Sequence, residues 1–142
     1  MLNVSDVMTR DVEVIAPEET LQRAAQMMDE LNVGALPVCT GNRLLGMITD
    51  RDITVRAVAA GSLPTETCVS DVMSEGVRWV HEDDSTDAVT KNMGGLQVRR
   101  VPVLNSRDEL VGIVSLGDLA TRRIGEADAA LRAISQPSMP DR

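Results

Sequence analysis

"VSDVM" occurs at residues 4–8 and again at residues 69–73, and this recurrence decides how the rest of the chain is interpreted. When the sequence is shifted by 65 residues, 11 of the 35 positions from 4 to 38 are identical, where chance would give roughly two. An insertion in the turn at 105–109 moves the offset to 66. Identities beyond it pair Leu44 with Leu110, Gly46 with Gly112, Asp52 with Asp118 and Arg56 with Arg122. The chain therefore contains two copies of one unit.

Both copies predict the same order of elements, β-α-β-β-α. A short apolar run is followed by an acidic helix cap, a helix, two strands joined by a polar turn, and a second helix. The expected ranges are 12–15, 20–32, 35–39, 44–49 and a helix from about 50 in the first copy, and 77–80, 85–97, 100–104, 110–115 and a helix from about 116 in the second. The hairpin pairs antiparallel strands and the crossover helix requires a parallel pair, so we expect a mixed sheet in an α+β (mixed α/β) fold.

The copy size also predicts how the copies associate. A unit of about 55 residues buries too little surface to be comfortably stable alone. We therefore expect the two repeats to pack around a pseudo-twofold axis. The predicted domains are repeat 1 at 2–60, a polar linker at 61–68, repeat 2 at 69–124, and a helix-like tail at 125–142 whose end is frayed.

Composition and charge exclude several classes of function. The net charge is −8, which disfavours nucleic acid as a partner, and Trp79 is the only aromatic residue. No stretch approaches the roughly 18 apolar residues that a membrane helix needs. The N-terminus lacks the apolar core of a signal peptide, so we expect a cytoplasmic protein without a membrane partner.

Cysteine and histidine are too sparse to predict a metal centre. Cys39 and Cys68 are expected to be reduced, small apolar residues, and His81 to be a surface residue in an acidic segment. Their spacing is not that of zinc ligands. A redox or metal role would need all three to meet in space or across a dimer. No nucleophile has a base beside it, so we do not expect an enzyme.

The repeated stretch "GMITDRD" (46–52) and "GIVSLGD" (112–118) places a hydroxyl and a carboxylate three residues apart. Thr49 and Ser115 fall where a strand becomes a helix, and their hydroxyls suit either a helix cap or a phosphate. Asp52 and Asp118 suit either the helix dipole or a ribose diol. Capping alone explains one such pair. Recurrence of the pair within a repeated unit favours a ligand.

A second candidate is the basic pair Arg99–Arg100, which precedes the strand "VPV". One interpretation is a solvated pair that balances nearby acids. The other is a phosphate clamp, because the arginine side chain fits phosphate oxygens well.

The doubled unit, with "GALPV" and "RRVPV" and with "GMITDRDI" and "GIVSLGDL", resembles a pair of CBS domains, also called a Bateman module. The resemblance covers residues 2 to 124, and the chain is similar to stand-alone two-CBS proteins of bacteria, including the mycobacterial hypoxic-response type. It implies binding of AMP, ADP or ATP, and in some members NAD or S-adenosylmethionine, in two clefts between the repeats.

The resemblance also implies roles for particular residues. In one cleft Asp118 would take the ribose, Ser115 the phosphate, and Arg99 with Arg100 would neutralise phosphate charge. In the other cleft Asp52 and Thr49 would take the first two roles. The residues expected beside adenine are Val12, Glu13, Val33, Gly34 and Ala35 in the first cleft, and Val77 and Arg78 in the second.

The expected function is a non-catalytic sensor of adenosine nucleotides that signals through the geometry of a homodimer to an unknown protein effector. Such a module requires no cofactor, and the nucleotide is its ligand. The alternative is a structural or protein-interaction dimer whose clefts bind no nucleotide.

Overall fold

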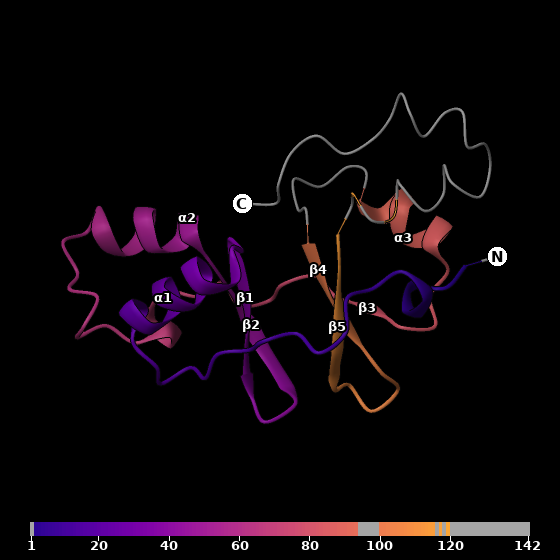
Figure 1. Ribbon diagram of the computed structural model, residues 1–142, viewed down its shortest axis with the longest axis horizontal. Helices are drawn as coiled ribbons and strands as arrows, with labels where there is room; N and C mark the ends of the chain where they lie inside the picture. Colours follow the sequence, from indigo (N-terminus) through magenta and orange to yellow (C-terminus); the bar gives the residue numbers. More distant parts are fainter. Residues whose placement is uncertain (1, 94–99, 116, 118, 120–142) are drawn as a thin grey trace. The chain divides into compact units, whose positions relative to one another are not determined.

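The computed structural model describes residues 2–93, 100–115, 117 and 119 (Figure 1). Two compact units divide the chain. The middle unit is Glu13–Val77, and the terminal unit combines the N-terminal segment up to Val12 with the chain from Arg78 onward. The "VSDVM" segment at 4–8 therefore packs with the second repeat, and its counterpart at 69–73 packs with the first.

Helix α1 (Leu21–Leu31) covers the hairpin of the middle unit (Figure 1). Its N-cap is Thr20, whose hydroxyl accepts the Arg23 amide at 3.2 Å, and it ends at Asn32 in the left-handed conformation. One face buries Leu21, Ala24, Met27 and Met28. The cap at Thr20 and the helical spacing of apolar residues predicted this helix, and the structure confirms it. The buried face was predicted in part: Ala25 and Leu31, expected on it, are exposed, and Met27 is buried.

The hairpin of the middle unit consists of β1 (Ala35–Thr40) and β2 (Arg43–Thr49), which pair antiparallel. Chain reversal occurs at Gly41, whose φ of +59° suits glycine. A short helix α2 (Asp50–Asp52) follows β2 without a break and continues as a π-helical segment, η2 (Ile53–Val58). A 3₁₀ turn, η3 (Val69–Asp71), comes later in the unit.

The terminal unit contains a mixed sheet, as predicted. Strand β3 (Val80–His81) runs parallel to β4 (Arg100–Leu104), which pairs antiparallel with β5 (Leu110–Ser115). Helix α3 (Thr86–Met93) lies between β3 and β4 in the chain. A 3₁₀ turn, η1 (Val4–Asp6), belongs to the same unit. The Ser85 hydroxyl accepts the Ala88 amide at 3.2 Å and caps α3.

Each unit has its own aliphatic core. That of the middle unit is formed by α1, both strands, Ala57 and the 69–73 segment. In the terminal unit the buried residues are Val4, Val7, Val89, Val101, Val103, Val114 and Leu119. Among the described residues these clusters contain no aromatic side chain, which agrees with the composition.

The first strand of each repeat is shorter than predicted. Of residues 12–15 only Ile15 pairs with β1, through its amide to the Pro37 carbonyl and its carbonyl to the Cys39 amide, both at 3.0 Å. Of residues 77–80 only Val80 lies in a strand. An apolar run predicts burial, but a strand also requires a partner along its whole length, and here the partner contact is short.

The predicted linker, 61–68, lies at the start of α1. The carbonyls of Thr67 and Pro64 accept the amides of Leu21 and Gln22 at 3.0 and 3.1 Å. These bonds satisfy first-turn amides that have no partner within the helix. The repeat boundaries at 2–60 and 69–124 stay a prediction, and the tail at 125–142 lies outside the described residues. No helix in the described part of the chain is long and apolar enough to cross a membrane.

Candidate functional site

Gly46 lies in β2 where a separate stretch of backbone crosses close to the strand. The Met47 amide donates to the Ser74 carbonyl at 3.0 Å, and the Ser74 amide donates back to the Met47 carbonyl at 2.8 Å. A Cβ atom at position 46 would collide with the Ser74 carbonyl oxygen. In the terminal unit, a Cβ at Gly112 would lie 2.7 Å from the carbonyl oxygen of Thr9. Close approach of backbone thus accounts for the glycine of both motifs.

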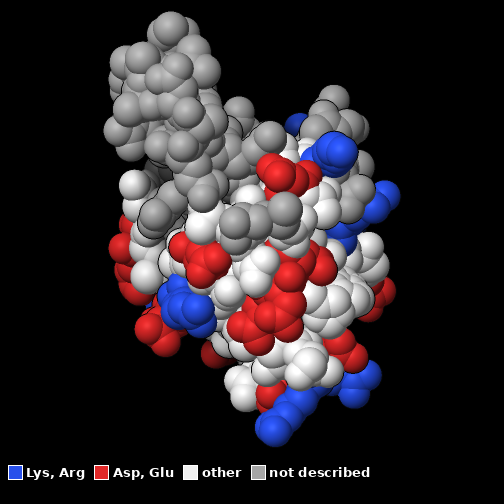
Figure 2. Space-filling model, turned by 90° about the vertical axis from the view of Figure 1, so that its right-hand side faces the viewer, with Lys and Arg blue, Asp and Glu red and all other residues white. Residues whose placement is uncertain are grey.

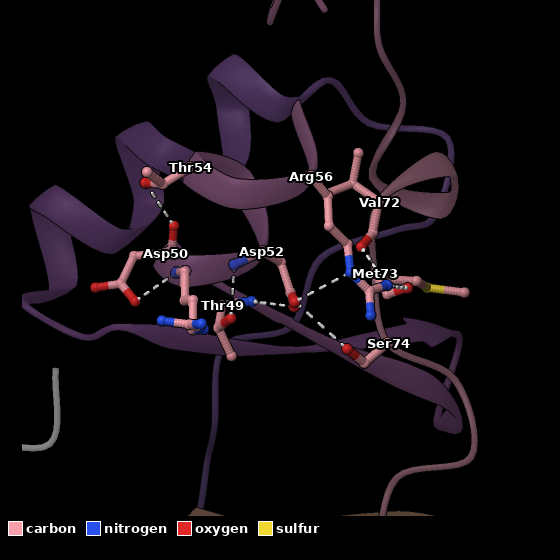
Figure 3. A network of polar contacts seen from close by, with 9 residues as sticks. Thr49, Asp50, Asp52, Thr54, Arg56, Val72, Met73 and Ser74 are labelled. Atoms are coloured by element: carbon pink, nitrogen blue, oxygen red, sulfur yellow. Dashed lines mark hydrogen bonds and ion pairs between the residues drawn. The ribbon is translucent and has the colours of Figure 1, made fainter. Parts of the chain in front are cut away.

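Thr49 and Asp52 hold each other at the start of α2 (Figure 3). The Thr49 Oγ1 atom accepts the Asp52 amide at 3.0 Å, and Asp52 Oδ2 accepts the Thr49 amide at 3.0 Å. This reciprocal arrangement is a capping box, in which two otherwise unpaired amides are satisfied by side chains. The capping interpretation of this pair is confirmed, and its ligand interpretation stays a prediction.

The two carboxylate oxygens of Asp52 differ in how firmly they are held. Whereas Oδ2 has its 3.0 Å bond, Oδ1 accepts the Ser74 hydroxyl at 3.4 Å and lies 3.8 Å from Arg56 Nε. A carboxylate oxygen accepts about two hydrogen bonds, and a bond at 3.4 Å is near the limit of useful strength. The Asp52 side chain is 13% exposed. Oδ1 is therefore the oxygen with more capacity for a further donor.

Arg56 lies in η2 and contacts the chain at the end of η3. Its Nη1 donates to the carbonyls of Val72 and Met73, both at 3.4 Å, while its Nε faces Asp52 (Figure 3). The side chain is 55% exposed, so its ion pair with Asp52 is partly screened by water. Arg56 thus contacts both the carboxylate and the backbone beside Ser74.

The helix that carries these residues is irregular. After α2 the backbone is π-helical, and the Ala59 amide donates to the carbonyl of Thr54, five residues back, at 3.0 Å. The Thr54 hydroxyl donates to the Asp50 carbonyl at 3.0 Å. Short π-helical turns are uncommon and concentrate at functional sites.

Gly34 and Ala35 lie beside Thr49. The Asp50 amide donates to the Gly34 carbonyl at 2.9 Å, and Ala35 is the partner of Thr49 across the hairpin. Val33, one residue earlier, donates its amide to a carbonyl of α1. The structure therefore places these three residues in the unit that carries Asp52. Their predicted grouping with the second repeat's carboxylate is untested, since that carboxylate belongs to Asp118, outside the described residues.

Ser115 and Arg100 lie opposite each other in the hairpin of the terminal unit. They are partners across β4 and β5, in the register that Ala35 and Thr49 occupy in the other hairpin. Ser115 is buried and Arg100 is half-buried. Arg99 lies outside the described residues, so its phosphate role stays a prediction.

The remaining predicted adenine contacts lie where the chain passes from one unit to the other. Val12 and Arg78 belong to the terminal unit, and Glu13 and Val77 to the middle unit. Both valines are half-buried, whereas Glu13 and Arg78 are exposed. Their roles stay predictions.

The cysteines are free thiols in different surroundings. Burial raises the pKa of the Cys39 thiol to about 11, and Cys68 is partly exposed at the start of η3. The His81 amide donates to the Asp84 carboxylate, and its ring meets Trp79 edge to face at 4.9 Å. Within the described residues no three His, Cys, Asp or Glu side chains are grouped to hold a metal ion.

Exposed carboxylates are a feature of the terminal unit. Figure 2 shows Asp and Glu side chains gathered near the middle of one face, with basic side chains mostly towards its margins. The terminal unit exposes Asp6, Asp83 and Asp87. Such a surface repels the phosphate backbone of nucleic acids.

The repeated architecture and the Gly-x-x-Thr/Ser-x-x-Asp pair agree with the comparison to protein families. The CBS domain model matches residues 4–58 and 69–125. The chain belongs to the CBS domain family. Both predicted repeats are therefore CBS domains in a mixed α+β fold, and the predicted family is confirmed.

Several CBS proteins are similar over most of this chain. CBS domain-containing protein YhcV of Bacillus subtilis is 40% identical over 141 residues, covering 98% of this chain and 99% of that protein. Hypoxic response protein 1 of Mycobacterium tuberculosis is 40% identical over 121 residues, covering 84% of each. A crystal structure of Hypoxic Response Protein I with two coordinated zinc ions is 38% identical, with a TM-score of 0.76 over 84% of this chain and 97% of that one.

A solved CBS pair with a bound ligand is also similar. The CBS domain pair of protein MJ0100, in complex with 5′-methylthioadenosine and S-adenosyl-L-methionine, is 25% identical, with a TM-score of 0.76. The match covers 89% of this chain and 98% of that one.

Sequence reasoning missed Ser74 as a partner of Asp52 in this CBS pair. The contact joins residues 22 positions apart, and no local spacing predicts it. A signal was present, because "VSDVM" is followed by a hydroxyl in both copies, Thr9 and Ser74. Arg56 also recurs, as Arg122, four residues after the motif aspartate.

Proposed function

We propose that this CBS protein binds an adenine nucleotide and acts as a regulatory module that performs no chemistry. The observation that carries the proposal is the Thr49–Asp52 pair at the junction of β2 and α2, repeated in sequence as Ser115 and Asp118. The pair offers an acceptor for a ribose and a donor for a phosphate within one short segment.

The hydrogen-bond inventory of the pair supports a ligand in addition to the cap. Thr49 Oγ1 is used as an acceptor by the Asp52 amide, which leaves its own proton to donate to a phosphate oxygen. Asp52 Oδ1 has only long contacts and can accept ribose hydroxyls, as an acidic residue does in dinucleotide sites. The ligand class is supported by the relative MJ0100, whose two ligands are both adenosine derivatives.

A regulatory role is supported by the match to CBS proteins and by how ligands act. Its matches to CBS proteins cover nearly the whole of it, and the sequence places no base beside a nucleophile. A ligand shifts an equilibrium between conformations only by its differential affinity for them. In this proposal the protein forms a homodimer, and bound nucleotide changes the dimer geometry that a protein effector recognises.

A specific observation favours a second candidate. The capping box already uses the Asp52 carboxylate and the Thr49 hydroxyl, so the pair has a structural role without any ligand. The second candidate is accordingly a structural or protein-interaction dimer that binds no nucleotide.

Calorimetric titration with AMP, ADP, ATP, NAD and S-adenosylmethionine separates the candidates. Asp52→Ala is expected to weaken nucleotide binding by about 10- to 100-fold, because a hydrogen bond to a charged group contributes about 1.5–3 kcal/mol. Asp50→Ala is the matched control, since Asp50 is exposed in the same helical turn and its carboxylate accepts the amide of the next residue, Arg51, at 2.8 Å. Asp118→Ala tests the second repeat. If the wild-type protein binds none of these ligands at millimolar concentration, the nucleotide proposal is refuted and the structural dimer is the remaining candidate.

A further inference from the structure

Asp52 Oδ1 is oriented by two residues that lie outside its own motif. The Ser74 hydroxyl donates to Oδ1 at 3.4 Å, and Arg56 Nε lies 3.8 Å from the same atom. The capping box fixes only the other oxygen. Without the two outside contacts, the single 3.0 Å bond to Oδ2 alone would set the torsion of the planar carboxylate, and with it the position of Oδ1.

The backbone that carries Ser74 is itself firmly held. Ser74 exchanges two backbone hydrogen bonds with Met47, at 2.8 and 3.0 Å, and the preceding carbonyls of Val72 and Met73 accept Arg56. Val72 and Met73 are buried in the core of the middle unit. The Ser74 hydroxyl faces Asp52 (Figure 3), and these backbone bonds hold it there.

The same position carries a hydroxyl in the other copy. Thr9 follows "VSDVM" at 4–8 as Ser74 follows it at 69–73. Thr9 exchanges backbone hydrogen bonds with Ile113 at 2.8 and 3.0 Å, as Ser74 does with Met47. The residue type differs between the copies, but the hydroxyl and its backbone anchor are shared.

We propose that Ser74, held by its backbone bonds to Met47, is a positioning residue that orients Asp52 Oδ1 for the ribose of the nucleotide. It thereby determines how strongly the site prefers a ligand with ribose hydroxyls to one without them. The inference rests on the proposed function. It extends the site from the Thr49–Asp52 motif to a segment 22 residues away in sequence.

The test compares AMP with 2′,3′-dideoxy-AMP, which lacks both ribose hydroxyls, by calorimetry. Ser74→Ala is expected to weaken AMP binding about two- to fivefold, because one long hydrogen bond that orients the acceptor is lost. It should leave binding of the dideoxy ligand within about twofold, because that ligand makes no use of Oδ1. A loss of fold alone would weaken the binding of both ligands equally. The ratio of the affinity for AMP to the affinity for the dideoxy ligand therefore separates positioning from stability.

Three further variants sharpen the result. Ser74→Thr keeps a hydroxyl, as Thr9 does in the other copy, and should retain the wild-type ratio. Ser70→Ala removes an exposed hydroxyl from the same segment and should also retain it. Arg56→Met should lower the ratio as Ser74→Ala does, because Oδ1 loses its contact with Nε and the chain before Ser74 loses its bonds to Nη1.

The outcomes distinguish this inference from the proposed function. Wild-type protein that binds AMP, with an unchanged ratio in Ser74→Ala, would overturn the inference alone. Wild-type protein that binds neither ligand would overturn both. A ratio that falls in Ser74→Ala and is restored in Ser74→Thr would support the inference.

Discussion

Replacing Gly46 with alanine tests the packing on which the whole site depends. The added methyl group would collide with the Ser74 carbonyl oxygen, which is backbone and cannot rotate away. Relief of the collision requires the Ser74 segment to leave β2, with loss of its two hydrogen bonds to Met47 at 2.8 and 3.0 Å. Each such bond contributes about 0.5–1.5 kcal/mol net, and overpacking adds about 1–3 kcal/mol. The expected loss in free energy of unfolding is therefore about 2–6 kcal/mol.

The matched control is Gly41→Ala in the hairpin turn. A Cβ there has no atom within 4 Å, but the φ of +59° costs an L-residue about 1–2 kcal/mol. Gly112→Ala should resemble Gly46→Ala, because its Cβ would lie 2.7 Å from both the Thr9 carbonyl oxygen and the Met8 sulfur. The measurement is the free energy of unfolding in urea, with circular dichroism as the signal. A Gly46→Ala protein as stable as Gly41→Ala would refute the close approach of Ser74 to β2.

Two further predictions concern stability and thiol chemistry. Thr20→Ala should cost about 1 kcal/mol in urea unfolding, because the Arg23 amide loses its cap, and equal stability to the exposed-site control Thr65→Ala would contradict this. The pKa of buried Cys39 is raised from 9.0 to about 11, so its contribution to stability is complete below pH 9 and is lost as pH rises towards 11. At pH 8 a thiol reagent should modify Cys68 in the native protein and Cys39 only after unfolding, and rapid native modification of Cys39 would overturn its burial.

Local features of the fold were predictable because they depend on neighbours in sequence. Thr20 and the apolar spacing behind it predicted the start of α1 and part of its buried face, including Leu21 and Met28. The pairing of β1 with β2 followed from two apolar runs joined by a short polar turn at Gly41. The mixed sheet followed from the repeated order of elements.

Features that depend on distant partners were not predictable. Nothing in "VSDVM" indicates that each copy packs with the other repeat's hairpin, because both hairpins offer the same glycine. The shortness of the first strands was not predictable for a related reason. The apolar pattern around Ile15 does not indicate how many of its residues pair with β1. In the candidate site, the Thr49–Asp52 cap was predictable from spacing, whereas the Ser74 contact with Asp52 was not.

The most direct test of the proposed site is a titration of ¹⁵N-labelled protein with AMP, in which the amide resonances of Thr49 and Asp52 are followed. These two amides belong to the capping box, so a ligand on Asp52 Oδ1 or on the Thr49 hydroxyl changes their surroundings. We expect both resonances to shift and to saturate together, with a dissociation constant in the micromolar range. Resonances that stay in place at millimolar AMP would contradict nucleotide binding at this pair and leave it as a helix cap.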